Sequence, residues 1–342
     1  MKIDAPLLGS PLSAAAGLAR DAEAAGFDGV FAFDGPFEPF ASLALAAAHT
    51  RLDVATGVAI ALARSPMTVA QAAHDLQLFS GGRFALGLGS QVRAHVERRF
   101  SMPWSRPVAR MKEYVAALRA IFACWNDDAP LSFEGGFYRH TLMPPLMKPP
   151  PCPEGPPPIL LAGVGPAMLE AAGEVADGCV LHPFHSRRYV ETVAMPALAA
   201  GRARAASPRD FRVTAQVLVV TGANDAEESA AREAVRAQLA FYASTPAYRP
   251  VLEAEGEGAL QEELRAMTRQ GRWSEMGVLV GDAMLARYAV AGRPEEAGRE
   301  LARRYDGIAS RVAIATPMLL GAEASARLVR GFREAAAGPA AD

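Results

Sequence analysis

The sequence has few cysteines, no excess of charge of one sign and no long apolar run. Its three cysteines lie far apart and show no CxxC spacing, which argues against a disulfide framework and indicates a reducing cytoplasm. The formal net charge is −2 and no basic stripe is present, so nucleic acid is not an expected partner. The longest apolar stretch, residues 55–63, is far shorter than a membrane span, so no membrane association is expected.

The motifs of several common enzyme classes are also missing. No HExxH or HxH spacing occurs, so no metal site is expected, and the absence of a GxSxG elbow argues against a serine hydrolase. Asp4 interrupts what would be the apolar region of a signal peptide, so none is predicted. Neither glycine cluster completes a GxGxxG fingerprint, because Val92 and Met168 occupy the third glycine position. This argues against a doubly wound open sheet.

Apolar segments alternate with helical patterns along almost the whole chain. With 342 residues, 51% of them hydrophobic, the chain can bury one large core. About eight segments are expected strands, each followed by a helical pattern, which is typical of an α/β fold of the (β/α)8 TIM-barrel type. These strands are residues 3–8, 29–33, 52–60, 84–89, 158–163, 178–182, 211–221 and 311–315.

Two insertions interrupt the repeat of this single expected domain, residues 1–342. Residues 127–158 are rich in proline, and Glu134-Gly135-Gly136 favours a small hairpin within a long loop laid over one barrel end. Residues 240–290 are long enough to roof a substrate pocket. The helices expected there cover residues 253–267, 272–280 and 282–290.

Residues 80–100 give the strongest indication of a ligand site in the sequence. It predicts a turn, a buried strand, and a loop that opens a helix. Gly87 and Gly89 would let the main chain approach a ligand closely. In a barrel of βα repeats, the rim that follows such a strand is where the chemistry takes place. The polar residues that follow on this rim are Ser90, Gln91 and His95.

Three longer segments resemble the luciferase-like monooxygenase superfamily, and within it the predicted oxidoreductases that use the deazaflavin coenzyme F420. They are SPMTVAQAAHDLQLFSGGRFALGLGSQ, PILLAGVGPAMLEAAGEVADGCVLHPF and AFYASTPAYRPVL. The similarity runs from Ile3 to about Ile314. It implies a TIM barrel with insertions that binds a flavin or deazaflavin at the carboxyl ends of its strands, commonly as a homodimer.

The resemblance implies a β-bulge after the third strand that lies against the back of the cofactor ring. In the family this bulge often contains a cis peptide bond that does not precede proline. Gly57 would ease the local backbone geometry. The residues expected to contact the cofactor from this strand and the next are Thr56, Gly57, Val58, Gly89, Ser90 and Gln91.

A second cofactor contact is expected where the fifth strand runs into a helix. Free backbone N–H groups and the helix dipole at this point suit a phosphate group. Pro166 in the first helical turn removes no helical hydrogen bond. Because FMN and F420 both carry such a phosphate, this site does not distinguish between them. The residues expected to bind it are Ala162, Gly163, Val164 and Gly165.

Asp34 ends the second strand, where F420-dependent sugar-phosphate dehydrogenases carry an Asp-His pair. In those relatives the aspartate contacts the deazaflavin and the histidine acts as acid or base. Asp34 matches this pattern, but Gly35 replaces the histidine and Val92 replaces a second carboxylate. Oxidation of sugar phosphates by that mechanism is therefore not expected. Glu38 is a substitute carboxylate in the same loop.

Two histidines are the other candidates for catalysis. His95 lies about one helical turn beyond Ser90, where it could hydrogen-bond a ring carbonyl and stabilise negative charge on the reduced ring. His182 ends the sixth strand, where it could contact substrate or donate a proton near neutral pH. A helix-surface histidine and a hydrogen-bonded structural histidine are the respective alternatives.

Together these features favour an F420-dependent oxidoreductase that transfers a hydride between the deazaflavin and a small organic substrate. Aromatic residues on the expected loops, such as Phe37 and Trp104, indicate an apolar pocket or anchor the loops. One alternative is an FMN-dependent monooxygenase of the same fold, which would need a reductase as partner. Another is a protein that binds or carries the flavin without catalysis.

Overall fold

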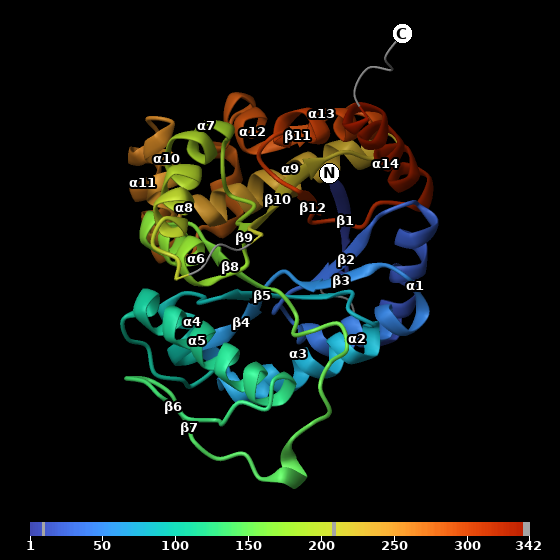
Figure 1. Ribbon diagram of the computed structural model, residues 1–342. Coiled ribbons are helices and arrows are strands. Elements are labelled where there is room, and N and C mark those ends of the chain that lie inside the picture. Colours follow the sequence, from blue (N-terminus) through green and yellow to red (C-terminus); the bar gives the residue numbers. More distant parts are fainter. Residues whose placement is uncertain (9–10, 207–209, 338–342) are drawn as a thin grey trace.

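Eight parallel strands form a closed barrel in the computed structural model, which describes residues 1–8, 11–206 and 210–337 (Figure 1). Neighbouring strands pair in chain order, and pairing of the first strand with the last completes the ring. The predicted TIM barrel is therefore confirmed. The strands are β1 (Lys2–Pro6), β2 (Gly29–Ala32), β3 (Asp53–Thr56), β5 (Phe84–Gly89), β8 (Ile159–Gly163), β9 (Gly178–Leu181), β10 (Arg212–Val220) and β12 (Arg311–Ala315).

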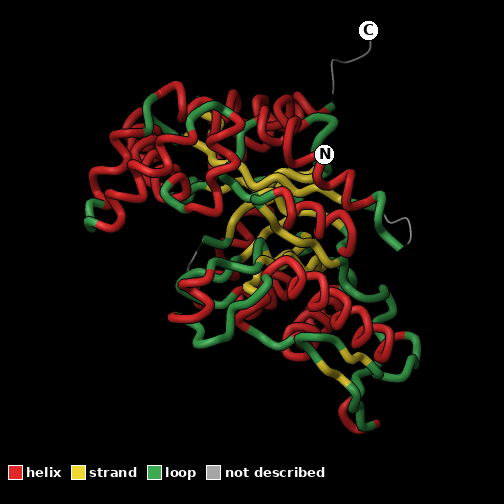
Figure 2. Tube along the Cα trace, turned by 90° about the vertical axis from the view of Figure 1, so that its left-hand side faces the viewer, coloured by secondary structure: helices red, strands yellow, loops and turns green. Residues whose placement is uncertain are grey.

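Helices surround the barrel, as the tube in Figure 2 shows, with the strands enclosed between them. Helix α3 (Pro66–Ser80) illustrates how the sequence sets their ends. The Ser65 hydroxyl accepts a hydrogen bond from the Thr68 N–H, and Gly81 ends the helix at φ 63°. The other helices of this layer are α1 (Leu12–Ala24), α2 (Pro39–His49), α4 (Arg93–Arg98), α5 (Pro107–Asn126), α6 (Pro166–Val175), α7 (Arg187–Tyr189), α8 (Met195–Arg202), α13 (Pro294–Tyr305) and α14 (Ala322–Ala336).

The second insertion differs from its predicted helices in two places. Gly256, at φ 77°, separates two helices where one was expected. The last helix ends at Tyr288, because residues 289–291 form a strand that pairs with residues 218–220 of β10. The elements are α9 (Asp225–Ala243), η4 (Pro246–Tyr248), α10 (Arg249–Ala254), α11 (Gly258–Arg269), η5 (Trp273–Leu279), α12 (Asp282–Tyr288) and β11 (Ala289–Ala291).

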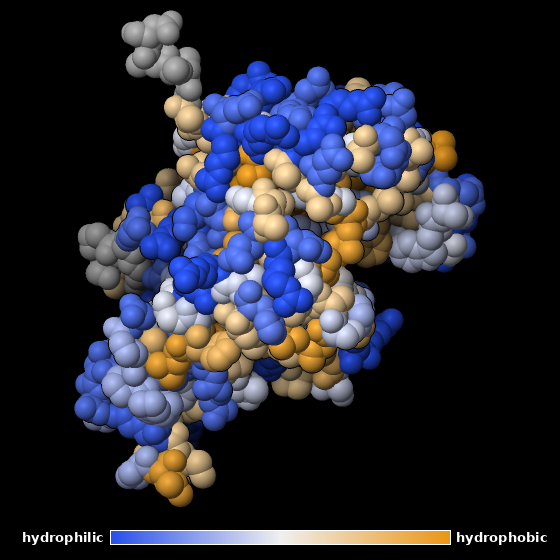
Figure 3. Space-filling view, turned by 90° about the vertical axis from the view of Figure 1, so that its right-hand side faces the viewer, coloured by the Kyte–Doolittle hydropathy of each residue, from blue (hydrophilic) through white to orange (hydrophobic). Residues whose placement is uncertain are grey.

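The first insertion forms an arm that projects past the helix layer instead of covering a barrel end (Figures 1 and 2). It contains the predicted hairpin, β6 (Phe133–Glu134) and β7 (Arg139–His140), and then η2 (Pro145–Met147). The Glu113 carboxylate on α5 accepts hydrogen bonds from three hairpin N–H groups and so anchors the arm. Figure 3 shows apolar atoms at the lower end of the molecule. Leu146, in η2 of this arm, is 92% exposed.

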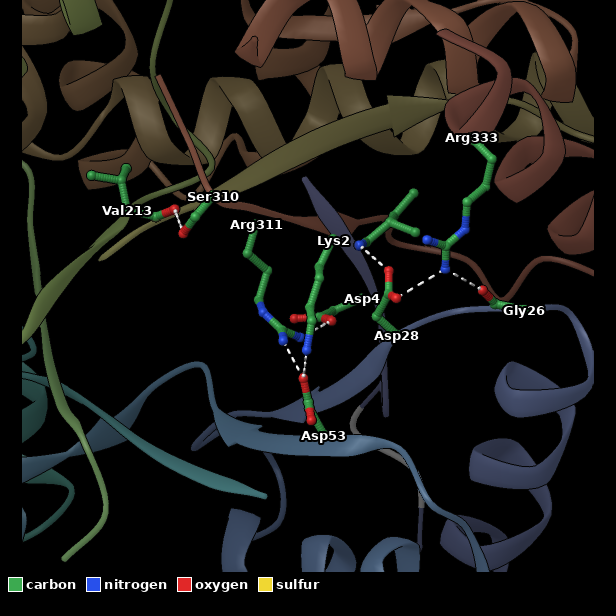
Figure 4. A network of polar contacts seen from close by, with 10 residues as sticks. Lys2, Asp4, Gly26, Asp28, Asp53, Val213, Ser310, Arg311 and Arg333 are labelled. Atoms are coloured by element: carbon green, nitrogen blue, oxygen red, sulfur yellow. Dashed lines mark hydrogen bonds and ion pairs between the residues drawn. The ribbon is translucent and has the colours of Figure 1, made fainter. Parts of the chain in front are cut away.

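A network of charged side chains joins the amino-terminal ends of three barrel strands (Figure 4). Arg311 on β12 contacts the carboxylates of Asp4 on β1 and Asp53 on β3, and Lys2 Nζ lies 2.7 Å from Asp53 Oδ2. Asp4 is buried, and this burial is the main cause that raises its pKa to about 7, although Arg311 opposes the shift. The network thus connects the first and last strands of the barrel.

None of the described helices combines the length and the apolar character needed to cross a bilayer.

Candidate active site

The carboxyl ends of β2, β3, β5, β8 and β9 lie side by side on one rim of the barrel. These strands are consecutive in the ring and parallel, so the loops that follow them meet at the same edge. Most of the residues predicted to bind a cofactor lie in these loops. We therefore describe this rim as the candidate active site, in keeping with the location of catalytic groups in this fold.

A bulge interrupts the third strand at Gly57 and Val58. The predicted strand over residues 52–60 is split into β3 and β4 (Ala59–Ile60), and the Gly57–Val58 peptide bond is cis, as the resemblance implied. The Gly57 N–H donates to the Ala32 carbonyl at 2.7 Å, and the Asp34 N–H donates to the Val58 carbonyl at 3.1 Å. The bulge is thereby fixed to β2, and its two residues remain partly exposed.

Two predicted cofactor ligands near the bulge are buried in the barrel wall instead. The Thr56 hydroxyl donates to the Gly87 carbonyl at 2.7 Å, and Thr56 is 1% exposed. Gly89 is buried, and a Cβ atom there would lie 2.8 Å from Val58 Cγ2. Thr56 and Gly89 therefore shape the wall behind the rim, and neither presents a side chain to a ligand.

The loop after β5 is held by its own polar side chains. Gln91 adopts φ 60°, and its Oε1 accepts a hydrogen bond from the Val92 N–H at 2.9 Å. The Ser90 hydroxyl donates to the Gln91 carbonyl at 3.2 Å. Both residues are partly exposed on the rim, whereas His95 is exposed on the short helix α4. The structure thus places His95 on the rim side of β5 with its imidazole open to solvent.

The segment from Ala162 to Gly165 offers an open main-chain surface. All four residues are partly exposed, and α6 begins directly after them. The N–H groups of Gly165 and Ala167 donate to no group in the described part of the chain. A Cβ atom at Gly165 would meet no atom of the described residues within 4 Å. Free N–H groups at a helix start and space beside them are what an anion such as phosphate requires.

Neither predicted carboxylate is free to act on a ligand. Arg64 forms two hydrogen bonds with Asp34, whose Oδ2 also accepts from the Ile60 N–H at 2.6 Å. The Glu38 carboxylate caps α2 by accepting from the Phe40 and Ala41 N–H groups. Asp34 therefore stabilises the loop after β2, and its expected contact with the cofactor stays a prediction. Glu38 stabilises a helix end, which makes it a poor candidate for proton transfer.

His182 is neutral, which corrects its predicted role as a proton donor near neutral pH. Burial, the larger cause, and the nearby His185 together lower the pKa of His182 to about 3. Its Nδ1 accepts from the Phe184 N–H at 3.1 Å, so the neutral ring carries its proton on Nε2. The rings of Tyr242 and Tyr248 each lie 4.7 Å from the imidazole, centroid to centroid. His182 can donate a hydrogen bond from Nε2, but it is not an imidazolium and so is a poor acid near neutral pH.

Sequence reasoning missed the residues that position this rim. Arg64 lies 30 residues from Asp34, and Gln216 donates from Nε2 to the Gly57 carbonyl at 2.7 Å across 159 residues. The Tyr189 hydroxyl donates to the Val164 carbonyl. A buried aspartate does signal that some cation must face it, but no local pattern identifies that partner.

A cavity of about 690 Å³ lies inside the barrel beneath the bulge and opens at the amino-terminal ends of the strands. Asp4 and Arg311 lie near its mouth, and Gly57 and Gln216 at its inner end. Small side chains such as Ala55 leave this space unfilled. Because catalytic groups of such barrels lie at the carboxyl ends of the strands, we do not assign the cavity as the active site.

Comparisons with known proteins identify the family of this chain. The family model of luciferase-like monooxygenases matches residues 2–311. An uncharacterised protein of Mycobacterium tuberculosis is 49% identical over 303 residues, 86% of this chain and 89% of that protein. The 5,10-methylenetetrahydromethanopterin reductase of Archaeoglobus fulgidus is 27% identical over 262 residues, 75% of each chain. The structure of the coenzyme F420-dependent tetrahydromethanopterin reductase of Methanopyrus kandleri has a TM-score of 0.77 at 20% identity, covering 96% of each chain. The chain belongs to the luciferase-like monooxygenase family and is an oxidoreductase of that type.

Proposed function

We propose that the chain is an F420-dependent oxidoreductase, in which bound F420 exchanges a hydride with a small apolar organic substrate. One structural observation carries the proposal. Three partly exposed main-chain segments, at residues 57–58, 90–91 and 162–165, meet on one rim while the strands beneath them are buried. The name of the Archaeoglobus fulgidus relative supports the choice of a reductase.

The residues on the rim fit such a cofactor. The N–H groups of Gly165 and Ala167 would bind its phosphate, since neither has an acceptor among the described residues and the start of α6 is open beside Gly165. Gly57 and Val58 would lie against one face of the ring. Because the bulge is hydrogen-bonded to β2, it would hold that face in a fixed position.

His95 is the group that we propose for holding or stabilising a proton near the ring. The Asp34 carboxylate is paired with Arg64, Glu38 caps a helix, and His182 is neutral at physiological pH. His95 is exposed beside the loop that carries Ser90. It is thus the ionisable candidate whose side chain remains available.

A fluorescence titration of the purified chain with F420, and in parallel with FMN, tests the proposal. Micromolar or tighter binding of F420 alone is expected. Tight binding of FMN alone, with rapid reoxidation of the reduced cofactor by air, would instead assign an oxygen-using monooxygenase, which the name of the family also favours. Binding of neither cofactor would refute the proposed site.

Two expectations about the state of the protein accompany this proposal. A homodimer is implied by the family resemblance, and a cytoplasmic location by the low cysteine content. Sedimentation velocity of the purified chain tests the first, and fractionation of the source cells tests the second.

A further inference from the structure

We infer that Gln216 is a positioning residue for the cofactor face, because it holds the Gly57 carbonyl from behind. This inference rests on the proposed function, in which the bulge at Gly57 and Val58 lies against the bound cofactor. Gln216 lies in the barrel interior and would not contact the cofactor itself. It would fix the position of the bulge that does.

The side chain of Gln216 crosses the barrel to reach the bulge. Gln216 lies on β10, and Gly57 follows β3, which stands opposite in the ring with three strands between them on either side. Gln216 Nε2 donates to the Gly57 carbonyl at 2.7 Å, and Gln216 is only 8% exposed. The hydrogen bond therefore connects two opposite walls of the barrel in a largely water-excluded position.

The bulge needs this support because a cavity lies directly beneath it. Gly57 and Gln216 both line the cavity of about 690 Å³, together with small side chains such as Ala55 and Ala85. At Gly57 itself, a Cβ atom would lie 2.7 Å from Phe31 Cδ2 and 2.9 Å from Gln216 Nε2. Phe31 and Gln216 thus occupy the space behind the bulge, and Gln216 supplies its polar contact.

Hydrogen bonds then fix the bulge from two directions. The N–H of Gly57 and the carbonyl of Val58 are bonded to β2 and the loop after it, within the barrel wall. The carbonyl of Gly57 is bonded across the barrel to Gln216. Without Gln216, water entering from the cavity would satisfy this carbonyl, but a water molecule is a mobile partner and would not hold its orientation.

Hydrogen exchange in the protein without cofactor tests whether Gln216 orders the bulge. The variants are Gln216→Met, which keeps the length but cannot donate, and Gln216→Glu, which keeps the shape. The control is Thr214→Val, which changes a residue of β10 that lines the same cavity. We expect exchange of the Gly57 and Asp34 amides to accelerate about tenfold or more in the Gln216 variants and not in the control. Unchanged exchange in both variants would overturn the inference.

Cofactor binding tests whether that order matters for the site. Loss of one buried hydrogen bond predicts roughly 5- to 100-fold weaker F420 binding in the Gln216 variants, measured below their unfolding temperatures. A merely structural role would lower the unfolding temperature and leave the Kd of the folded protein unchanged, which would overturn the inference. If the unaltered chain binds neither F420 nor FMN, the proposed function fails, and the exchange rates alone decide whether Gln216 orders the bulge.

Discussion

Arg64 holds the Asp34 carboxylate through two hydrogen bonds, from Nη1 to Oδ2 at 2.5 Å and from Nη2 to Oδ1 at 2.8 Å. The Asp34 side chain is 5% exposed and that of Arg64 is 19% exposed, so the pair is largely shielded from water. A carboxylate held in this way stabilises the loop after β2 from within the protein. It also links that loop to β4, because Asp34 Oδ2 accepts from the Ile60 N–H.

We predict that Arg64→Ala lowers the free energy of unfolding by about 2–4 kcal/mol, because it leaves the Asp34 carboxylate buried without its cation. Urea denaturation measures this change. The matched control is Arg93→Ala, since Arg93 forms an exposed pair with Glu97 and its loss should cost less than about 1 kcal/mol. Equal effects of the two variants would contradict the internal role of Asp34.

We predict that Gly165→Ala weakens cofactor binding without destabilising the protein. Gly165 has φ −77° and ψ 149°, which alanine adopts readily, and within the described part of the chain no atom lies within 4 Å of where its Cβ atom would be. The methyl group would instead occupy the space expected for the phosphate. Gly281→Ala is the control, because Gly281 also precedes a helix with an ordinary φ of −71° and open space beside it. Equal F420 affinity in the two variants would argue against a phosphate at α6.

We predict that His182 remains neutral from pH 8 down to pH 5. Its pKa of about 3 in the folded protein lies below the value of 6.5 for an exposed histidine, so the unfolded chain binds the proton more tightly. Stability should therefore fall as the pH falls below 6.5, and His182 should contribute about 1–2 kcal/mol of that loss between pH 7 and pH 5. His182→Asn, which keeps an acceptor for the Phe184 N–H, should reduce the loss. NMR titration of the imidazole provides the direct measurement, and a midpoint near 6.5 would contradict the assignment.

Asp4 should produce a pH dependence of the opposite sign. Its pKa is raised from 3.8 to about 7 in the folded protein, so the folded chain binds the proton more tightly than the unfolded chain. Stability should fall as the pH rises from about 4 through 7, by up to about 1.4 kcal/mol per pH unit from this one group. We predict that Asp4→Asn flattens this part of the stability profile, measured by urea unfolding at pH 5, 6, 7 and 8. A parallel profile in the variant would show that Arg311 keeps Asp4 ionised throughout.

The barrel could be predicted because its strands are local features of the sequence. The expected strands over residues 84–89 and 311–315 coincide with β5 and β12, since each is a short apolar run with clear ends. Strand β11 could not be predicted in the same way. It has three residues at the end of a helical pattern, and it forms a strand by pairing with residues 218–220 of β10, beyond the part of β10 that pairs with β9.

In the candidate site, main-chain roles were predictable and side-chain roles were not. The resemblance placed the bulge at Gly57, where a Cβ atom would lie 2.7 Å from Phe31 Cδ2, and Gly165 before Pro166 indicated the open helix start. The roles of Asp34 and His182 depend on partners and burial that arise from distant parts of the chain. Residue type shows that such a side chain is polar. It does not show whether another group of the protein already forms a hydrogen bond or an ion pair with it.

The attachment of β11 to β10 has a consequence for how this protein could diverge in evolution. Residues 289–291 join the second insertion to the barrel by main-chain pairing with residues 218–220, and such pairing places few demands on side-chain identity. Many side chains of α9 to α12 could therefore change during evolution while β11 kept the insertion in place. Such changes would alter which substrates the protein accepts. The barrel would then change little among relatives, and differences in specificity would arise mainly in the second insertion, which β11 attaches to it.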